Sequence, residues 1–536
     1  MPSGLRYHTG ALPRSKNVNV HFQGGGYSWR HVLGLFFSRG KTPEEGNLSH
    51  TYSLNGGLDW EGPFVENNSV AEGQSGYDPK KLPYQVTYAI HMNAVVRGRL
   101  FIWFKGYDPD ETGPSGSLYR LYGKAIRRYE VQKVSCKATV GSPVIKLNWK
   151  DHGLSGDGGS KSDSVIIKKF VGLQQTGGIG GIANSKFADT ALKVTVIDGN
   201  NFTITVPASS PNATSNEEQV KIVGLTVEPW GWVERRYNSD NRTWEEAALA
   251  VIGSPAITSI NLSQSLWKTA SGKYLSAVSG NFKHIMRVPD PFDGSQTAFT
   301  KGAEMARCTG DGPGSPKYLT EPTIHGDPAN ETVFGFLRPQ AKPYEASRDP
   351  EFWSSTNAGA TVSQSAISKN AANKSIAARC PIPCGLGDDG KIYGFCMERL
   401  TDHTGDIEFR PAYLLVADKT TALANGGSAF TVHEIGEALI NSQSESIFTQ
   451  ADYDAAGQTV PSGQAVDRSS EASNTGLPTC VKHGSWLFFF YEEQEQGLWL
   501  NSEGMSSLEN GWSNIKYFAI DTAAVNKPLR VRGALG

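Results

Sequence analysis

Short apolar runs rich in aromatic residues recur along the chain, and each follows a polar turn, in most cases with a glycine. The five runs are Leu100–Phe104, Tyr274–Leu275, Val333–Leu337, Ile392–Phe395 and Trp486–Tyr491. Such runs are typical of buried β-strands, and the turn before each one indicates a hairpin. Strands that are apolar at nearly every position need cover on both faces, which stacked sheets supply.

The hairpins predict an all-β fold. Each is followed by a further run that can pair with it, such as Ala412–Val416 and Gln496–Leu500. Five hairpins and one N-terminal unit favour a β-propeller of about six blades. Two stacked β-sandwiches are the alternative, because hairpins alone do not fix a topology. A length of 536 residues suggests about two to four domains, although a single propeller can reach this size.

The octapeptide Ser53–Trp60 is a turn with Asn55, Gly56 and Gly57 at its centre. These residue types allow φ > 0 and local hydrogen bonds, and Trp60 can place its ring between neighbouring sheets. The octapeptide resembles the Asp-box of sialidase-like β-propellers, Ser-x-Asp-x-Gly-x-Thr-Trp, with Asn for the Asp and Asp59 for the Thr. Imperfect repeats occur at Gly26–Trp29, Ser239–Trp244 and Asn501–Ser506, although a chain with 59 Gly and 12 Trp also produces such matches by chance.

Residues 132–229 do not follow the hairpin repeat. Two alternating runs, Ala191–Ile197 and Phe202–Val206, flank the turn Asp198-Gly199-Asn200, which predicts a separate hairpin. The block resembles a small β-barrel insert of bacteriophage tail proteins that is related to a domain of ubiquitin-activating enzymes. The matching residues are His152, Gly153, Leu154, Val194, Val196, Asp198, Asn200, Phe202, Thr203 and Ile204, while Ser185–Ala188 replace the Asn-Gly that the family has.

The expected organisation therefore has four parts. Residues 1–30 form an extended N-terminal arm, 31–131 the first part of the propeller, 132–229 the inserted small β-barrel domain and 230–536 the remainder of the propeller. Residues 442–475, rich in Ser, Gln, Ala and Gly, are expected to form a long loop.

Charge and composition exclude several classes of function. Lys plus Arg total 51 and Asp plus Glu 53, so net charge does not favour nucleic acid or an anionic membrane. No run approaches the roughly 18 apolar residues of a membrane span, and the N-terminus lacks the apolar core of a signal peptide. We therefore expect no membrane span. Six cysteines are few for a disulfide scaffold of this length, so we expect reduced thiols and synthesis in the cytoplasm.

The resemblance to sialidases implies three arginines that hold a sugar carboxylate, a Tyr–Glu pair and an acid/base Asp. The candidates are Arg287, Arg338, Arg399 and Arg410, with Tyr491 beside Glu492 and Glu493. The Arg-Ile-Pro signature of that family is missing, and the acidic run at Glu492–Glu495 is where a solvated hairpin turn is expected. Arginines after strands also form ion pairs at blade edges. We therefore expect no enzymatic activity and no catalytic residue.

Other clusters have simpler explanations. Cys380, Cys384 and Cys396 lack the paired ligand spacing of a zinc site, and His152 and His403 are isolated. Gly177–Gly181 is not followed by the Lys-Ser/Thr of a phosphate loop. We expect no metal and no cofactor.

The two resemblances together imply a bacteriophage virion protein of the tail, assembled in the host cytoplasm. The expected role is structural: a ring-forming nozzle or hub component around the DNA channel. Its partners would be further copies in a homo-oligomeric ring, other tail proteins such as adaptor and fibres, and passing DNA without sequence readout. One alternative is a glycan-binding receptor-binding protein or adhesin that uses Trp29, Trp60 and Trp244. Another is a sialidase-like glycosidase that uses Arg338 and Tyr491.

Overall fold

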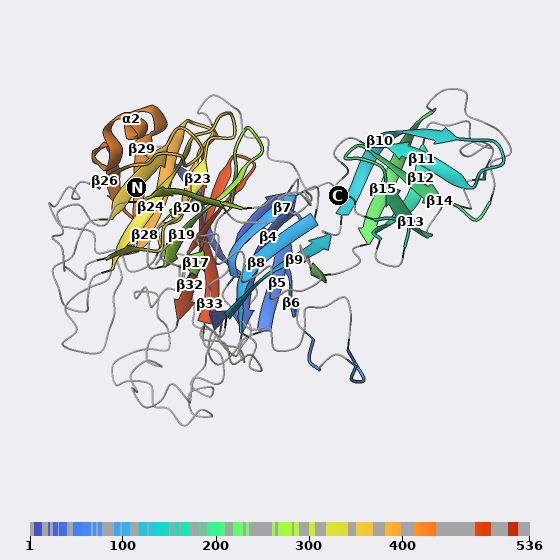
Figure 1. The fold of residues 1–536 in the computed structure, drawn as a ribbon, viewed down its shortest axis with the longest axis horizontal. Coiled ribbons are helices and arrows are strands. Elements are labelled where there is room, and N and C mark those ends of the chain that lie inside the picture. The colour runs from blue at the N-terminus through green and yellow to red at the C-terminus, as the bar shows by residue number, and fades with distance from the viewer. Residues whose placement is uncertain are drawn as a thin grey trace.

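The computed structural model is built almost entirely of antiparallel β-strands (Figure 1). It describes residues 5–12, 20–21, 25–29, 32–39, 47–65, 68–70, 73–77, 90–96, 99–107, 117–125, 128–149, 152, 154, 156–159, 162–171, 182–183, 186, 190–208, 218–228, 232–234, 260–262, 266–280, 284–288, 300–305, 318–340, 350–367, 381–397, 412–435, 478–494 and 513–523. Within these ranges, no helix is long and apolar enough to cross a membrane.

The described strands form six antiparallel sheets and one closed barrel. Sheet 1 holds β2 (Val20–His21), β3 (Gly26–Trp29), β4 (Val32–Arg39), β5 (Asn47–Ser53) and β6 (Glu61–Val65). Sheet 2 holds β7 (Ile90–Val96), β8 (Arg99–Tyr107), β9 (Ser117–Ala125) and β16 (Trp232–Glu234). Sheet 3 holds β17 (Ile260–Leu262), β18 (Trp267–Lys268), β19 (Tyr274–Gly280), β20 (His284–Val288) and β21 (Thr300–Glu304).

The C-terminal half supplies the other three sheets. Sheet 4 holds β22 (Tyr318–Thr320), β23 (His325–Gly326), β24 (Val333–Gln340), β25 (Glu351–Ser355) and β26 (Ser363–Ala366). Sheet 5 holds β27 (Cys384–Leu386), β28 (Lys391–Met397), β29 (Ala412–Asp418) and β30 (Thr431–Glu434), and α2 (Lys419–Asn425) and the 3₁₀ turn η2 (Gly426–Ala429) follow β29. Sheet 6 holds β31 (Thr479–His483), β32 (Trp486–Gln494), β33 (Ser513–Asp521) and β1 (Arg6–Ala11).

The first strands of successive sheets contact one another in a closed ring. β3 contacts β7, β7 contacts β17, β18 contacts β23, β23 contacts β27, β27 contacts β31, and β31 returns to β3. Sheets arranged in this way around a central axis form a β-propeller. The ring is closed by β1, which pairs with the C-terminal strand β33 from Arg6 opposite Asp521 to Ala11 opposite Lys516. The predicted N-terminal arm thus contributes strands β1, β2 and β3 to the sheets.

The closed barrel is inserted in sheet 2, between β9 and β16. It consists of β10 (Arg128–Ala138), β11 (Val144–Asn148), β12 (Ser164–Val171), β13 (Ala191–Val196), β14 (Asn201–Thr205) and β15 (Glu218–Glu228). It has a core of its own, with Ile145, Leu147, Val165, Val194 and Phe202 at 1% exposure or less. Figure 1 shows the barrel to one side of the stacked sheets. The chain enters the barrel through β10 and leaves it through β15.

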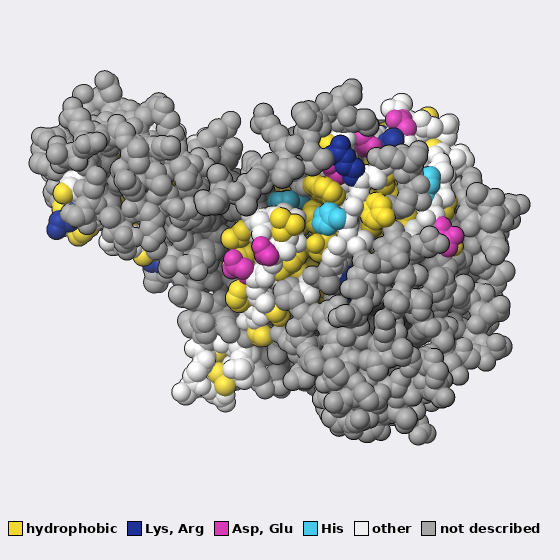
Figure 2. Space-filling model, turned by 180° about the vertical axis from the view of Figure 1, so that it is seen from behind, with side chains coloured by type: hydrophobic (Ala, Val, Ile, Leu, Met, Phe, Trp, Pro, Cys, Tyr) yellow, Lys and Arg dark blue, Asp and Glu magenta, His cyan; other side chains and the backbone are white. Residues whose placement is uncertain are grey.

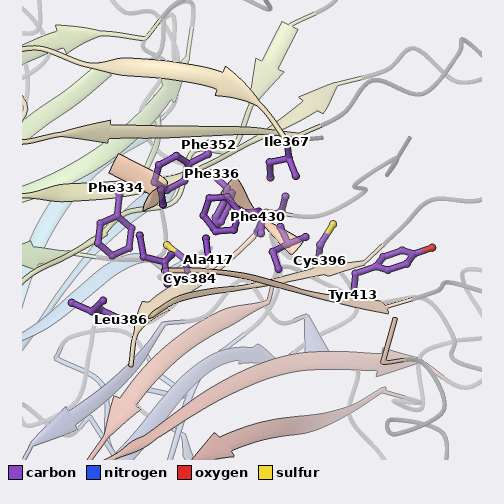
Figure 3. Packing of buried hydrophobic residues seen from close by; sticks show 14 residues of the cluster. Phe334, Phe336, Phe352, Ile367, Cys384, Leu386, Cys396, Tyr413, Ala417 and Phe430 are labelled. Atoms are coloured by element: carbon purple, nitrogen blue, oxygen red, sulfur yellow. The ribbon is translucent and has the colours of Figure 1, made fainter. Parts of the chain in front are cut away.

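Hydrophobic side chains, many of them aromatic, pack between neighbouring sheets. Figure 3 shows the cluster between sheets 4 and 5, in which Phe334, Phe336 and Phe352 face Cys384 and Phe430. Further clusters join sheets 3 and 4, sheets 5 and 6, and sheets 6 and 1. Every residue of β25 is buried, so this strand is covered on both faces, as the apolar pattern predicts for the stacked sheets.

The acidic run differs from the prediction. Glu492–Gln494 extend β32 and pair with β33, because the apolar run before them is already part of this long antiparallel pair. Several predicted features lie outside the described residues: Gly177–Gly181, Ser239–Trp244, Arg399, His403, Arg410, residues 442–475, Gln496–Leu500 and Asn501–Ser506.

Candidate functional site

The two ends of the ring carry different chemistry, and sheet 4 shows which residues belong to which end. Val333 pairs with Ser355, and Leu337 pairs with Glu351. The turns 327–332 and 355–362 therefore lie at one end of the sheet, which we call the turn face. Arg338 lies at the opposite end, which we call the Arg338 face.

Two octapeptide turns on the turn face share one hydrogen-bond pattern. In the first, Ser53 Oγ accepts from Gly57 N at 2.8 Å, and Asn55 Oδ1 accepts from Asp59 N at 2.9 Å. In the second, Ser355 Oγ accepts from Gly359 N at 2.9 Å and Asn357 Oδ1 accepts from Thr361 N at 2.9 Å. In each turn the Ser hydroxyl also donates to the Asn side chain at 2.9 Å.

Each octapeptide turn packs on the preceding sheet of the ring. The ring of Trp60 packs against Phe490 and Tyr517 of sheet 6, and Tyr517 Oη donates to the carbonyl of Gly57 at 3.0 Å. In the second turn, the carbonyl of Gly359 accepts from Ala303 N of sheet 3 at 2.8 Å. Trp60 thus has a packing role. The sequence argument missed Ser355–Val362, which has the Ser, Asn, Gly and Thr of the pattern but ends in Val362 instead of Trp.

Polar contacts on the turn face tie neighbouring sheets together. Lys419 Nζ lies 2.6 Å from Asp327 Oδ2, and Lys482 Nζ lies 2.8 Å from Asp388 Oδ1. Ser271 N donates to Glu331 at 2.7 Å. Burial acts to raise the pKa of Asp327, but the hydrogen bond from Lys419 and further donors lower it overall. In Figure 2 acidic and basic side chains lie side by side near the top, the end on which α2 lies in Figure 1.

The Arg338 face carries a largely buried ion pair between Glu321 and Arg338. Glu321 Oε2 lies 2.8 Å from Arg338 Nε, and the side chains are 26% and 19% exposed. Burial raises the pKa of Glu321, and the charge of Arg338 opposes this only in part. The backbone of Glu321 has φ = 50°, a conformation that is uncommon for residues other than Gly and is concentrated at functional sites. A carboxyl group with a raised pKa can carry a proton, and the guanidinium beside it can bind an anion.

The other predicted site residues are placed elsewhere. Arg287 is exposed and pairs with Leu275 at the turn-face end of β20. Tyr491 is 2% exposed, and its ring stacks on Phe395 at a centroid distance of 5.7 Å in the core between sheets 5 and 6. Glu492 and Glu493 are strand residues of β32. Arg338 is therefore the predicted candidate for which the structure describes a carboxylate partner, Glu321.

The histidines His152 and His325 and the thiol of Cys384 have structural surroundings. The ring of His325 lies 4.4 Å from that of Trp267, and burial lowers the pKa of His325 to about 3. Burial raises the pKa of Cys384 to about 12. In the barrel, His152 accepts from Leu154 N through Nδ1 at 2.9 Å, so its Nε2 donates to the carbonyl of Asp198 at 2.8 Å. Among the described residues, no three His, Cys, Asp or Glu side chains are grouped so that they could hold a metal ion.

The chain is similar to solved structures of sialidases. The chain superposes on "Phage phi92 endosialidase" with a TM-score of 0.62 and 12% identity, over 98% of this chain and 70% of that one. A mutant of Trypanosoma rangeli sialidase displaying trans-sialidase activity gives a TM-score of 0.44 at 10% identity, over 96% of this chain and 58% of that one. The NanB sialidase of Streptococcus pneumoniae gives 0.43 at 10% identity, over 96% and 70%. No protein-family model matches the sequence, and no curated protein matches it.

The similarity to the endosialidase defines the class of fold, a sialidase-like β-propeller, and confirms the all-β propeller. It also corrects one prediction. The expectation that the chain is not an enzyme was wrong, since the solved structure that it matches with a TM-score of 0.62 is that of an endosialidase. The argument from the missing Arg-Ile-Pro signature failed because a short motif can change while the fold persists. Similarity at this level of identity establishes the fold, and the activity of this chain is a separate question.

Proposed function

We propose that this protein is a sialidase-like glycosidase that hydrolyses bonds in a glycan with carboxylated sugars. The observation that carries the proposal is the Glu321–Arg338 pair, a largely buried carboxyl group with a raised pKa beside a guanidinium. It lies on the face opposite the octapeptide turns, which are occupied by packing between sheets. The similarity in fold to an endosialidase supports the substrate class.

The two residues have different roles in the proposed hydrolysis: Arg338 binds the substrate and Glu321 transfers a proton. Arg338 Nε lies 2.8 Å from Glu321 Oε2, and in the proposed complex its two terminal NH₂ groups bind the carboxylate of a sugar, a match that arginine makes better than lysine. Protonated Glu321 gives its proton to the bridging oxygen as the glycosidic C–O bond breaks. Water adds its hydroxyl to the anomeric carbon, and the proton left from that water restores Glu321.

Turnover of sialylated substrates by the purified full chain tests the proposal. A fluorogenic sialoside and a polysialylated polymer are incubated with wild type, Glu321→Gln, Arg338→Lys and the control Arg287→Lys. Glu321→Gln removes the general acid and lowers kcat by about 100-fold or more. Arg338→Lys raises KM, because lysine lacks the planar guanidinium that makes two parallel hydrogen bonds to a carboxylate. Arg287→Lys keeps wild-type activity, since Arg287 is exposed on the turn face. Wild-type protein that cleaves neither substrate, or full activity in Glu321→Gln, contradicts the proposal.

A place on a phage tail is a second part of the proposal. It is supported by the similarity to a phage endosialidase and by the resemblance of the barrel to inserts of tail proteins. Mass spectrometry of purified virions would find the chain in stoichiometric amounts. A ring-forming nozzle is the remaining structural candidate, and electron microscopy of tails distinguishes a ring around the channel from a peripheral enzyme.

A further inference from the structure

The inner strand of sheet 4 is interrupted next to Glu321. β22 pairs with β24 as far as Thr320 opposite Arg338, and β23 resumes the pairing at His325 opposite Phe334. Between these two pairs the inner strand has one residue more than β24, which is a β-bulge. Glu321 is the first residue of the bulge, so its position depends on how the bulge is held.

Thr323 holds the bulge through its backbone and its hydroxyl. Its N–H donates to the carbonyl of Phe336 at 2.9 Å, and its Oγ1 accepts from Phe336 N at 3.1 Å. The hydroxyl proton goes to the carbonyl of Ile382, at 2.7 Å, just before the first strand of sheet 5. Thr323 is 4% exposed. One hydroxyl therefore joins the bulge to β24 and to the neighbouring sheet.

Gly335 leaves room for this arrangement. A Cβ atom at Gly335 would lie 1.8 Å from the carbonyl oxygen of Thr323, so only Gly allows the bulged backbone to approach β24 this closely. The side chains of Phe336 and Ile382 belong to the core between sheets 4 and 5. The bulge is thus fixed by contacts with β24 and with sheet 5. Glu321, its first residue, has the uncommon backbone conformation with φ = 50°.

We propose that Thr323 is a positioning residue, whose hydroxyl fixes the bulge that presents the Glu321 carboxyl group to Arg338. The role in turnover rests on the proposed function, while the position and protonation of Glu321 do not. Without the hydroxyl the bulge relaxes, Glu321 moves away from Arg338, and its carboxyl group becomes more hydrated. The pKa of Glu321 then falls toward that of an ordinary glutamate, because burial is what raises it.

Thr323→Val and Thr323→Ser in the full chain test this role. Val keeps the volume and loses the hydroxyl, whereas Ser keeps the hydroxyl. With a sialylated substrate, we expect Thr323→Val to lower kcat about 10-fold or more with KM changed less than about threefold. The alkaline limb of the pH profile of Thr323→Val moves to lower pH. The kcat of Thr323→Ser stays within about threefold of the wild-type value. A purely structural residue would lower the amount of folded protein and leave the pH profile of the remainder unchanged.

Infrared titration of the carboxyl band that Glu321→Gln removes gives a readout without substrate. The proposal expects this band to titrate at lower pH in Thr323→Val than in wild type and to be unchanged in Thr323→Ser. If the wild type hydrolyses nothing and the band still shifts, the proposed function fails and the positioning role stands. If the wild type is active, and Thr323→Val has the same kcat and the same titration of the carboxyl band as the wild type, the positioning role is wrong. Should Thr323→Val not fold, Thr323→Cys, whose thiol is a weak donor, takes its place with the same expected direction.

Discussion

Removing the serine hydroxyl from the octapeptide turns would weaken the contacts between sheets. Ser53 and Ser355 are 0% and 3% exposed, and each hydroxyl accepts from a buried Gly N–H and donates to an Asn side chain. Ser→Ala leaves the Gly N–H without its acceptor, which costs about 1–3 kcal/mol. We expect the free energy of unfolding to fall by about 2 kcal/mol for either variant.

The double variant adds a further test. The two turns lie in sheets 1 and 4 and pack on different neighbours, sheets 6 and 3. Effects at distant sites are additive, so Ser53→Ala with Ser355→Ala would lose about 4 kcal/mol.

Urea unfolding followed by tryptophan fluorescence measures these losses. Ser363→Ala is the matched control: Ser363 is exposed on β26, just after the second turn, and its substitution changes the free energy of unfolding by less than about 0.5 kcal/mol. Octapeptide variants that are no less stable than this control would refute the view that the turns clamp neighbouring sheets. A much larger loss for the double variant than for the sum would contradict independent turns.

Two further predictions concern charge on and near the turn face. The pKa of His325 is lowered to about 3, so the folded protein keeps the ring neutral while the unfolded chain takes up a proton below its ordinary pKa of about 6.5. Stability is therefore lost as pH falls through that value, by up to about 2 kcal/mol at pH 5, and urea unfolding at pH 7 and pH 5 would show a smaller difference in His325→Gln. An equal difference in both proteins would contradict this. Lys419→Met removes the 2.6 Å ion pair with Asp327 and would destabilise the protein by about 1 kcal/mol. In the control Lys391→Met, the lysine side chain is half exposed and its Nζ lies 3.9 Å from Asp389 Oδ2, so the substitution would change stability little. Equal losses in the two variants would argue against a specific ion pair at Lys419.

The sequence pattern predicted the strands well where local apolar runs decide the structure. Val333–Leu337 became part of β24, and Trp486–Tyr491 became part of β32. The two barrel runs became the paired strands β13 and β14. These elements are specified by apolar content and turn residues that lie within a few positions of one another, so a single sequence is enough to find them.

The candidate site was only half visible in the sequence. Arg338 was singled out and expected to form an ion pair, and it does. Its partner Glu321 was missed, because the contact depends on a bulge, on an uncommon backbone conformation and on Thr323 bonding to the next sheet. Tyr491 looked like a reactive neighbour of carboxylates, yet the same aromatic run that predicts its strand buries it. Pairing between sheets and burial at a sheet end are decided by the whole ring and leave no local pattern.

The most direct test of the proposed function is a crystal structure of Glu321→Gln with a sialylated oligosaccharide bound. The account predicts that the sugar carboxylate lies within hydrogen-bond distance of the terminal nitrogens of Arg338, with a glycosidic oxygen next to the side chain of residue 321. A sugar bound on the turn face beside Trp60, with Arg338 holding no ligand, would contradict it.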